Sequence, residues 1–173
     1  KGLKKLARIP KTPGQAIIFV TVVGVVGCWL NWGFGLIIGA LFAKELAKQV
    51  KGVDYRLLIA SAYTGLIVWH GGLSGSIPLK LASANGLEAA TAGAVTEAIP
   101  TSLTLFSPLN LFILLGILIG MPLVNKAMHP DAKNTITIDP ALLKDDEEEV
   151  YEAKTPADKM ENSKIIWALL VIM

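Results

Sequence analysis

Three long stretches of the chain carry no charged residue, and they constrain its fold more than any other feature. Residues 12–43, 57–79 and 98–125 contain no Asp, Glu, Lys or Arg. Runs of about 18 or more apolar residues are typical of segments that cross a membrane. The whole chain is 17% charged, against about 25% in an ordinary soluble domain. We therefore expect an all-α integral membrane protein and exclude a soluble globular domain.

The first uncharged run is too long for one ordinary membrane span. As a straight helix its 32 residues would measure about 48 Å, whereas the hydrocarbon core is about 30 Å thick. Basic residues flank the run on both sides, and such residues tend to stay in the cytoplasm. A re-entrant helical hairpin over residues 15–50, with its tip at 29–35, leaves both flanks on one side. The alternative is a single long, tilted helix.

The second uncharged run contains the most irregular local sequence. A plausible half-span ends near Trp69 and is followed by HGGLSGSIP at residues 70–78. Three glycines and a proline within this stretch cannot continue as a regular helix, whereas proline is favoured at the first position of a new helix. The pattern predicts a discontinuous transmembrane helix over residues 55–84, broken at 70–78.

The remaining segments complete a predicted topology. The chain ends in an apolar run of nine residues, which would reach only about 14 Å as a helix, so we expect a fragment of a longer membrane protein. The other expected segments are a basic cytoplasmic segment (1–14), a polar extracytoplasmic connection (85–102), a transmembrane helix (103–125) with Gly116 and Gly120 on a face suited to close packing, an acidic cytoplasmic loop (126–164) and the start of a further transmembrane helix (165–173).

The predicted break offers groups that can bind a small ligand. The amino end of a half-helix favours an anion, and unwound carbonyl groups favour a cation. Ser74 and Ser76 add hydroxyl groups, and Asn31 at the predicted hairpin tip adds an amide. These three residues are candidates for binding a small carboxylate and, more weakly, Na⁺. The alternative is a glycine-rich kink that only permits helix packing.

His70 is the one residue of the second run that titrates near neutral pH. An ionisable group at membrane depth is a functional candidate by default. The imidazole could carry a proton or donate a hydrogen bond to substrate; alternatively, a backbone carbonyl at the break could satisfy it. The His70-Gly71-Gly72 sequence resembles the oxyanion motif of some lipases, but no Asp–His pair accompanies Ser74. We therefore expect no enzyme, no catalytic residue, and no cofactor or metal beyond Na⁺ or H⁺ as a coupling ion.

Four motifs between about residues 15 and 130 carry a family resemblance. They are WLNWGFG (29–35), VDYRLL (53–58), WHGGLSGSIPL (69–79) and IPTSLTLFSPLN (99–110). These motifs resemble those of the bacterial short-chain fatty acid transporter family, whose members include acetoacetate and butyrate uptake proteins. The WHGGLSGSIPL motif is the most specific of the four.

The resemblance implies a fold and a site. The family belongs to an ion-transporter superfamily that includes the divalent anion/sodium symporters, which implies an inverted-repeat secondary transporter. This truncated chain would hold one repeat, consisting of a re-entrant hairpin, a broken helix and a full span. Substrate and ion sites would lie where the hairpin tip and the break meet. The expected substrate-binding residues are Asn31, Gly33, His70, Gly72, Ser74, Gly75 and Ser76.

We thus expect ion-coupled secondary transport of short-chain carboxylates such as acetate, butyrate or acetoacetate. The expected location is the bacterial cytoplasmic (inner) membrane, with multiple crossings. Expected partners are the carboxylate, the lipid bilayer, the missing repeat and a second copy in a homodimer, with no nucleic acid. Two alternatives stay open: a membrane anchor that presents the acidic loop 139–161 to a cytosolic partner, and an anion channel.

Overall fold

The computed structural model describes residues 2–143, 155–161 and 163. The chain divides into two units, Lys1–Leu143 and Lys144–Met173. The acidic run at 145–149 and the expected start of a further span at 165–173 lie outside the described residues. The first unit contains the helices α1 (Gly2–Leu6), α2 (Pro13–Leu30), α3 (Trp32–Gln49), α4 (Tyr55–Tyr63), α5 (Ser76–Leu81), α6 (Leu87–Ala90) and α7 (Pro108–Ala127), and the 3₁₀ helices η1 (Thr64–Gly71), η2 (Thr101–Leu103) and η3 (Pro140–Leu143).

The second unit contains one described helix, α8 (Pro156–Glu161). A reciprocal pair of hydrogen bonds starts it: the Thr155 hydroxyl accepts from the Asp158 backbone N–H at 3.2 Å, and the Asp158 carboxylate accepts from the Thr155 N–H at 2.7 Å. Such a pair satisfies donors that an uncapped helix start leaves free.

All regular elements among the described residues are helical, which confirms the expected all-α class. Three segments are long and apolar enough to cross a membrane by length and composition, namely Pro13–Leu30, Tyr55–Leu81 and Pro108–Ala127. Helix α3 is not among them, because its second half contains Lys44, Glu45 and Lys48. The chain is a multi-pass membrane protein.

Side-chain caps start each of the long helices. The Thr12 hydroxyl accepts from the Gln15 backbone N–H before α2, and the Ser107 hydroxyl accepts from the Asn110 N–H before α7. In both helices a proline occupies the first turn, where its missing N–H leaves no hydrogen bond unmade. Helix α7 therefore begins at Pro108, five residues later than the sequence pattern predicted.

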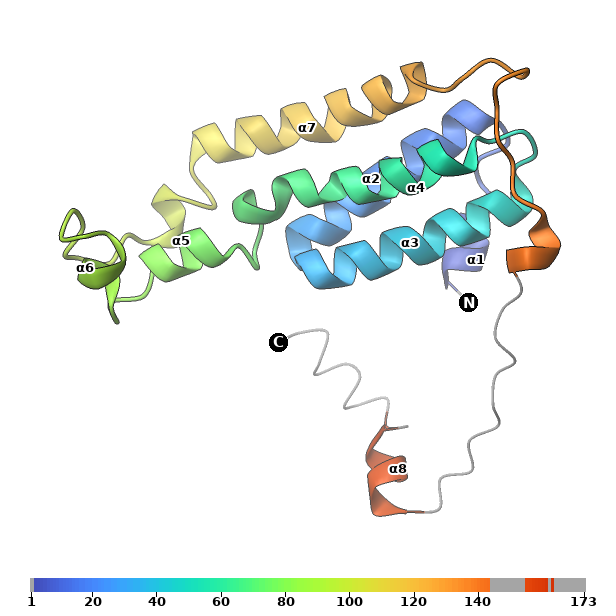
Figure 1. Cartoon of the computed structure of the whole chain (residues 1–173). Coiled ribbons are helices and arrows are strands. Elements are labelled where there is room, and N and C mark those ends of the chain that lie inside the picture. The colour runs from blue at the N-terminus through green and yellow to red at the C-terminus, as the bar shows by residue number, and fades with distance from the viewer. Residues whose placement is uncertain (1, 144–154, 162, 164–173) are drawn as a thin grey trace. The chain divides into compact units, whose positions relative to one another are not determined.

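Four helical segments run side by side in the first unit: α2, α3, α7 and the continuous α4–η1 segment (Figure 1). Helix α2 contacts each of the others. The start of α2 and the end of α7 lie at one end of the bundle, where a Cβ at Gly14 would be 3.1 Å from the Lys126 side chain. We call this the basic end. At the opposite end, the turn end, the α2–α3 turn lies near the end of η1, and α5 and α6 extend beyond it (Figure 1).

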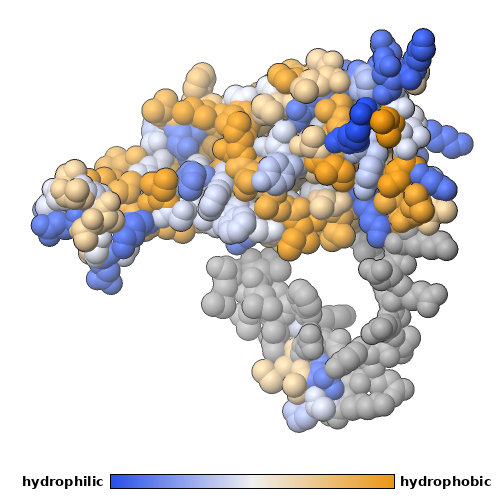
Figure 2. Space-filling model, in the orientation of Figure 1, coloured by the Kyte–Doolittle hydropathy of each residue, from blue (hydrophilic) through white to orange (hydrophobic). Residues whose placement is uncertain are grey.

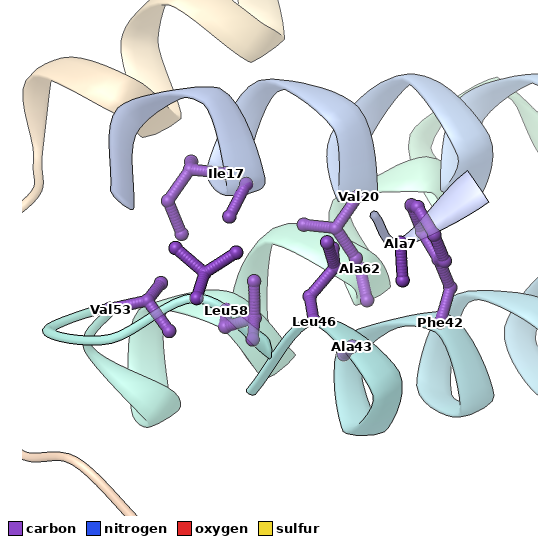
Figure 3. Packing of buried hydrophobic residues seen from close by; sticks show 11 residues of the cluster. Ala7, Ile17, Val20, Phe42, Ala43, Leu46, Val53, Leu58 and Ala62 are labelled. Atoms are coloured by element: carbon purple, nitrogen blue, oxygen red, sulfur yellow. The ribbon is translucent and has the colours of Figure 1, made fainter. Parts of the chain in front are cut away.

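The main hydrophobic core lies between α1, α2, α3 and α4, toward the basic end (Figure 3). Phe42 and Leu46 of α3 and Ile17 and Val20 of α2 are fully buried there. A smaller cluster around Val25, Cys28 and Val68 joins α2 to η1 and contacts the middle of α7. These contacts hold η1 against α2 near the α2–α3 turn.

Helix α7 is the least covered of the four segments, with only Pro122 and Asn125 buried. The predicted close packing at Gly116 and Gly120 does not occur within the described residues, because a Cβ at either position would have no neighbour within 4 Å. Figure 2 shows broad hydrophobic areas on the face of the first unit that it draws, with hydrophilic residues at the basic end and at the opposite end, around α5 and α6. Such an apolar surface is typical of a helix that faces lipid or another membrane helix.

Candidate functional site

The α2–α3 turn consists of a single residue, Asn31, which ends one helix and caps the next. Its side-chain Oδ1 accepts a hydrogen bond from the Phe34 backbone N–H at 3.0 Å. The predicted tip at 29–35 is therefore mostly helical, because residues such as Trp29 and Trp32 fit a helix and the cap needs only one extended residue. The cap leaves the exposed NH₂ group of Asn31 available as a donor.

The broken helix is interrupted over four residues, Gly72–Gly75. Helix η1 continues through Gly71, and α5 begins at Ser76. The irregular stretch is thus shorter than the predicted 70–78, because Trp69 and His70 remain in the 3₁₀ helix and Pro78 falls inside the first turn of α5, where proline is tolerated.

Two hydrogen bonds join the turn to the break. The Trp32 backbone N–H donates to the Ser74 hydroxyl at 3.0 Å, and the Leu73 N–H donates to the Trp29 carbonyl at 2.7 Å. Gly72 permits this contact, since a Cβ there would lie 2.5 Å from the Trp29 carbonyl oxygen. The structure therefore brings Asn31, Ser74 and Gly72 into one region at the turn end.

Gly75 lies among three backbone carbonyl groups. A Cβ at this position would be 2.9 Å from the His70 oxygen, 3.0 Å from the Trp69 oxygen and 3.1 Å from the Gly72 oxygen. Oxygen atoms that converge on an unwound segment are the groups that bind Na⁺ in broken-helix transporters. Among the described residues, no group of three or more His, Cys, Asp or Glu side chains could hold another metal ion.

Two of the predicted site residues take no part in the hydrogen bonds between the turn and the break. Ser76 has an exposed side chain at the start of α5, and no hydrogen bond in the described part of the chain joins it to the turn. Gly33, in the first turn of α3, is half-buried and lies beside the Asn31 side chain. A Cβ at this position would be 3.5 Å from the Asn31 Oδ1 atom.

Three aromatic rings line the contact between turn and break. Trp69 stacks on His70 at a centroid distance of 4.5 Å and an interplanar angle of 17°, and it also lies 5.1 Å from Trp32. The Trp69 Nε1–H group is buried without a hydrogen-bond partner among the described residues. A buried donor without an acceptor is unusual, so we add Trp69 to the candidate site. The sequence alone does not distinguish such a residue from a tryptophan that anchors a helix at the membrane interface.

A cavity of about 210 Å³ adjoins the break on the side of α5 and the start of α7. The amide of Asn110 holds one wall, donating to the Gly71 carbonyl at 3.1 Å and to the Leu105 carbonyl at 2.7 Å. Sequence reasoning missed Asn110, because its partners lie on other elements. The lining residues are His70, Ile77, Pro78, Leu81, Thr104, Leu105 and Asn110.

A second polar cluster lies deeper in the bundle, between α2, η1 and α7. The Asn125 side chain donates to the Thr21 hydroxyl at 3.1 Å and to the Thr64 hydroxyl at 3.0 Å. Each hydroxyl in turn donates to a carbonyl of its own segment, Ile17 for Thr21 and Ser61 for Thr64. The cluster links three helical segments, and no sequence motif predicted it.

Asp54 forms a third polar centre, at the basic end. Its carboxylate accepts from the backbone N–H groups of Leu57 at 2.9 Å and Ile136 at 2.8 Å, and from the Arg56 guanidinium at 3.1 Å. Burial alone would raise the pKa of Asp54, but these hydrogen bonds and the Arg56 charge lower it to about 2. The residue joins the start of α4 to the segment that follows α7.

Comparison with known proteins gives consistent matches over the whole chain. A family model described as "Short chain fatty acid transporter" matches residues 1–173. Two relatives share the name "Putative short-chain fatty acid transporter". The Escherichia coli K12 protein is 39% identical over 171 residues, and the Haemophilus influenzae Rd protein is 41% identical over 172 residues.

These alignments cover 97% and 96% of the present chain but 38% of each relative. The chain therefore spans less than half the length of the curated relatives it matches. No solved structure gives a significant match. The names of the relatives describe transporters, in agreement with the expectation that the chain does not belong to an enzyme.

Proposed function

Because the chain belongs to the short-chain fatty acid transporter family, we propose that the full-length protein carries short-chain carboxylates across the bacterial cytoplasmic membrane. Acetate, butyrate and acetoacetate are the proposed substrates, and transport is proposed to be driven by an ion gradient. The whole protein performs this activity, since the chain accounts for 38% of the length of its relatives. That the missing part holds an inverted second repeat, and that the protein forms a homodimer, stay predictions.

The contact between the α2–α3 turn and the break supports this proposal best. It gathers polar groups that bulk lipid could not satisfy: the Ser74 hydroxyl, the Asn31 amide and the buried Trp69 N–H. The N-terminus of the 18-residue helix α3 also points its partial positive charge to this region. A small carboxylate can accept hydrogen bonds from all of these donors.

Two arrangements support ion coupling. The carbonyl oxygens of Trp69, His70 and Gly72 lie close together against Gly75, and backbone carbonyl groups at a helix break are among the groups that bind Na⁺ in transporters. The exposed side chain of His70 lies next to them in the chain, and an imidazole can take up and release a proton. We propose that Na⁺, bound at the carbonyl groups, is the coupling ion. The alternative coupling ion is a proton carried by His70.

Uptake by the full-length protein in proteoliposomes tests the proposal. Radiolabelled butyrate should accumulate when an inward Na⁺ gradient is imposed, or a proton gradient if His70 carries the coupling ion. Uptake should saturate with butyrate concentration; current without saturation would indicate a channel instead. Failure to take up any short-chain acid under either gradient would refute the proposed function.

Serine variants locate the substrate site. Ser74→Ala should raise the KM for butyrate about tenfold, because a hydrogen bond to a charged group is lost. Ser76→Ala tests the predicted role of Ser76, which lacks a contact with the turn. Ser83→Ala is the matched control, because Ser83 follows the end of α5 at Leu81. Equal KM values for all three variants would remove both serines from the site.

A further inference from the structure

The cavity beside the break combines an apolar wall with two free polar groups. Four of its lining residues are apolar and come from α5 and the segment before α7: Ile77, Pro78, Leu81 and Leu105. The other three, His70, Thr104 and Asn110, are polar and lie toward the break and the start of α7. This division fits a ligand with one charged end and a short hydrocarbon chain.

Thr104 supplies a donor that the described chain leaves unused. Its hydroxyl oxygen is buried and has no hydrogen-bond partner among the described residues. Buried hydroxyl groups are almost always paired, so this one indicates a missing acceptor. The His70 ring lines the same cavity and carries at least one N–H group. Its stacking on Trp69 restricts how the ring can turn.

Asn110 plays a different part in the cavity. Both N–H bonds of its amide are occupied, by the Gly71 carbonyl and the Leu105 carbonyl. The residue therefore holds the end of η1 against the segment before α7 and keeps the cavity open. Asn110 is a positioning residue and not a donor to the ligand.

We propose that this cavity holds the hydrocarbon chain of the transported acid and sets the longest acid that the protein carries. In this position the carboxylate accepts hydrogen bonds from Thr104 and His70, and the chain lies against Ile77, Leu81 and Leu105. The donors at the α2–α3 turn do not line this cavity, so the two groups of donors mark successive positions of the substrate. This inference rests on the proposed function and adds residues for chain-length selection. The volume of about 210 Å³ lies below the roughly 300 Å³ at which pockets for drug-sized ligands begin, as expected for an acid of few carbons.

Substitution of Ile77 tests the selectivity. In the full-length protein, Ile77→Phe should narrow the cavity and raise the KM for butyrate about tenfold while the KM for acetate changes less than twofold. Leu79→Phe is the matched control, because Leu79 is exposed on the same short helix, as Ile77 is, but does not line the cavity. An unchanged ratio of the two KM values in Ile77→Phe would overturn the proposal.

Substitution of Thr104 tests the carboxylate end. Thr104→Val keeps the side-chain shape and removes the hydroxyl, so the KM for acetate and for butyrate should rise together, by about tenfold. Thr101→Val, three residues earlier, is the control and should leave both values unchanged. A Thr104→Val protein with wild-type KM values for both acids would remove Thr104 from the site.

A binding measurement separates this inference from the transport proposal. In detergent, 10-fold excess butyrate over its KM should slow alkylation of Ile77→Cys and leave alkylation of Leu79→Cys unchanged. Protection without any uptake in proteoliposomes would support the cavity and refute transport. Uptake without protection would support transport and overturn the cavity as the substrate site.

Discussion

The Asp54 carboxylate illustrates how one residue can join two distant segments. Because it accepts hydrogen bonds from Leu57 and Ile136, we expect Asp54→Asn to lower the stability of the purified protein by about 1–2 kcal/mol, through loss of the cap and of a charge-assisted bond. Thermal unfolding in detergent measures this effect. Asp131→Asn, at an exposed position, serves as the control, and an equal melting temperature for both variants would contradict the role of Asp54.

The lowered pKa of Asp54 also predicts how stability depends on pH. Its pKa is about 2 in the folded protein and about 3.9 in an unfolded chain. The folded state therefore gains stability from this group at every pH above about 4, and it loses that gain as the pH falls from about 4 through about 2. Unfolding measured across this range should show a smaller acid-dependent loss in Asp54→Asn than in the wild type. Parallel curves would show that other carboxylates dominate.

Asn125 connects three helical segments through one amide. Asn125→Ala removes both of its hydrogen bonds, to Thr21 and Thr64, and interhelical bonds in membranes average about 0.6 kcal/mol each. We therefore expect a loss of about 1 kcal/mol in unfolding measurements. In a double-mutant cycle with Thr64→Val, the two losses should be less than additive. Full additivity would show that the two side chains do not interact.

Among the structural elements, the α2–α3 hairpin depends on glycines that allow close approach. A Cβ at Gly35 would overlap the backbone of Cys28, so Gly35→Ala should force the two helices apart and sharply reduce the yield of folded protein. Gly33→Ala is the control, because its Cβ would meet only the Asn31 side chain, at 3.5 Å. The fraction of monodisperse protein in detergent measures the effect. Equal fractions would contradict the close contact.

The same elements show what the sequence could predict and what it could not. Charge placement predicts a turn near Asn31, with a single long helix as the alternative, and the glycines predict an interruption over residues 70–78. The sequence pattern does not predict the 3₁₀ segment Thr64–Gly71, in which Gly65 lies against the backbone of Gly24 on another helix. Runs of this length are uncommon and often mark a hinge.

The polar residues that the sequence left unassigned share one property. Asn110 and Asn125 bond to partners 39 and 104 residues away, respectively. Periodicity reports which face of a helix is apolar, but it does not report which distant backbone group a single amide will meet. Ser74 is predictable because it lies within a glycine-rich break, and the break itself is a local pattern.

At the scale of the whole molecule, the order of the hairpin and the two candidate spans that follow it determines at which end of the bundle each connecting segment lies. The α2–α3 turn returns the chain, so Lys11 and Lys51 flank the hairpin at the basic end, where α7 also ends beside Gly14. Tyr55–Leu81 then leads away from that end, and Pro108–Ala127 returns to it (Figure 1). Lysine and arginine favour the cytoplasmic side, so the basic end is expected in the cytoplasm. The re-entrant character of the hairpin stays a prediction.

Labelling of single cysteines in a cysteine-free background of the full-length protein tests whether the chain returns to the side from which the hairpin starts. Lys11→Cys and Lys51→Cys should react with a membrane-impermeant maleimide only in inside-out vesicles, and Glu88→Cys, on the connection beyond α5, only in right-side-out cells. A single tilted helix in place of the hairpin would instead expose Lys11→Cys and Lys51→Cys on opposite sides. Because the turn and the four helical segments are held by direct contacts, labelling of those two positions from opposite sides would contradict the fold itself and not only its orientation.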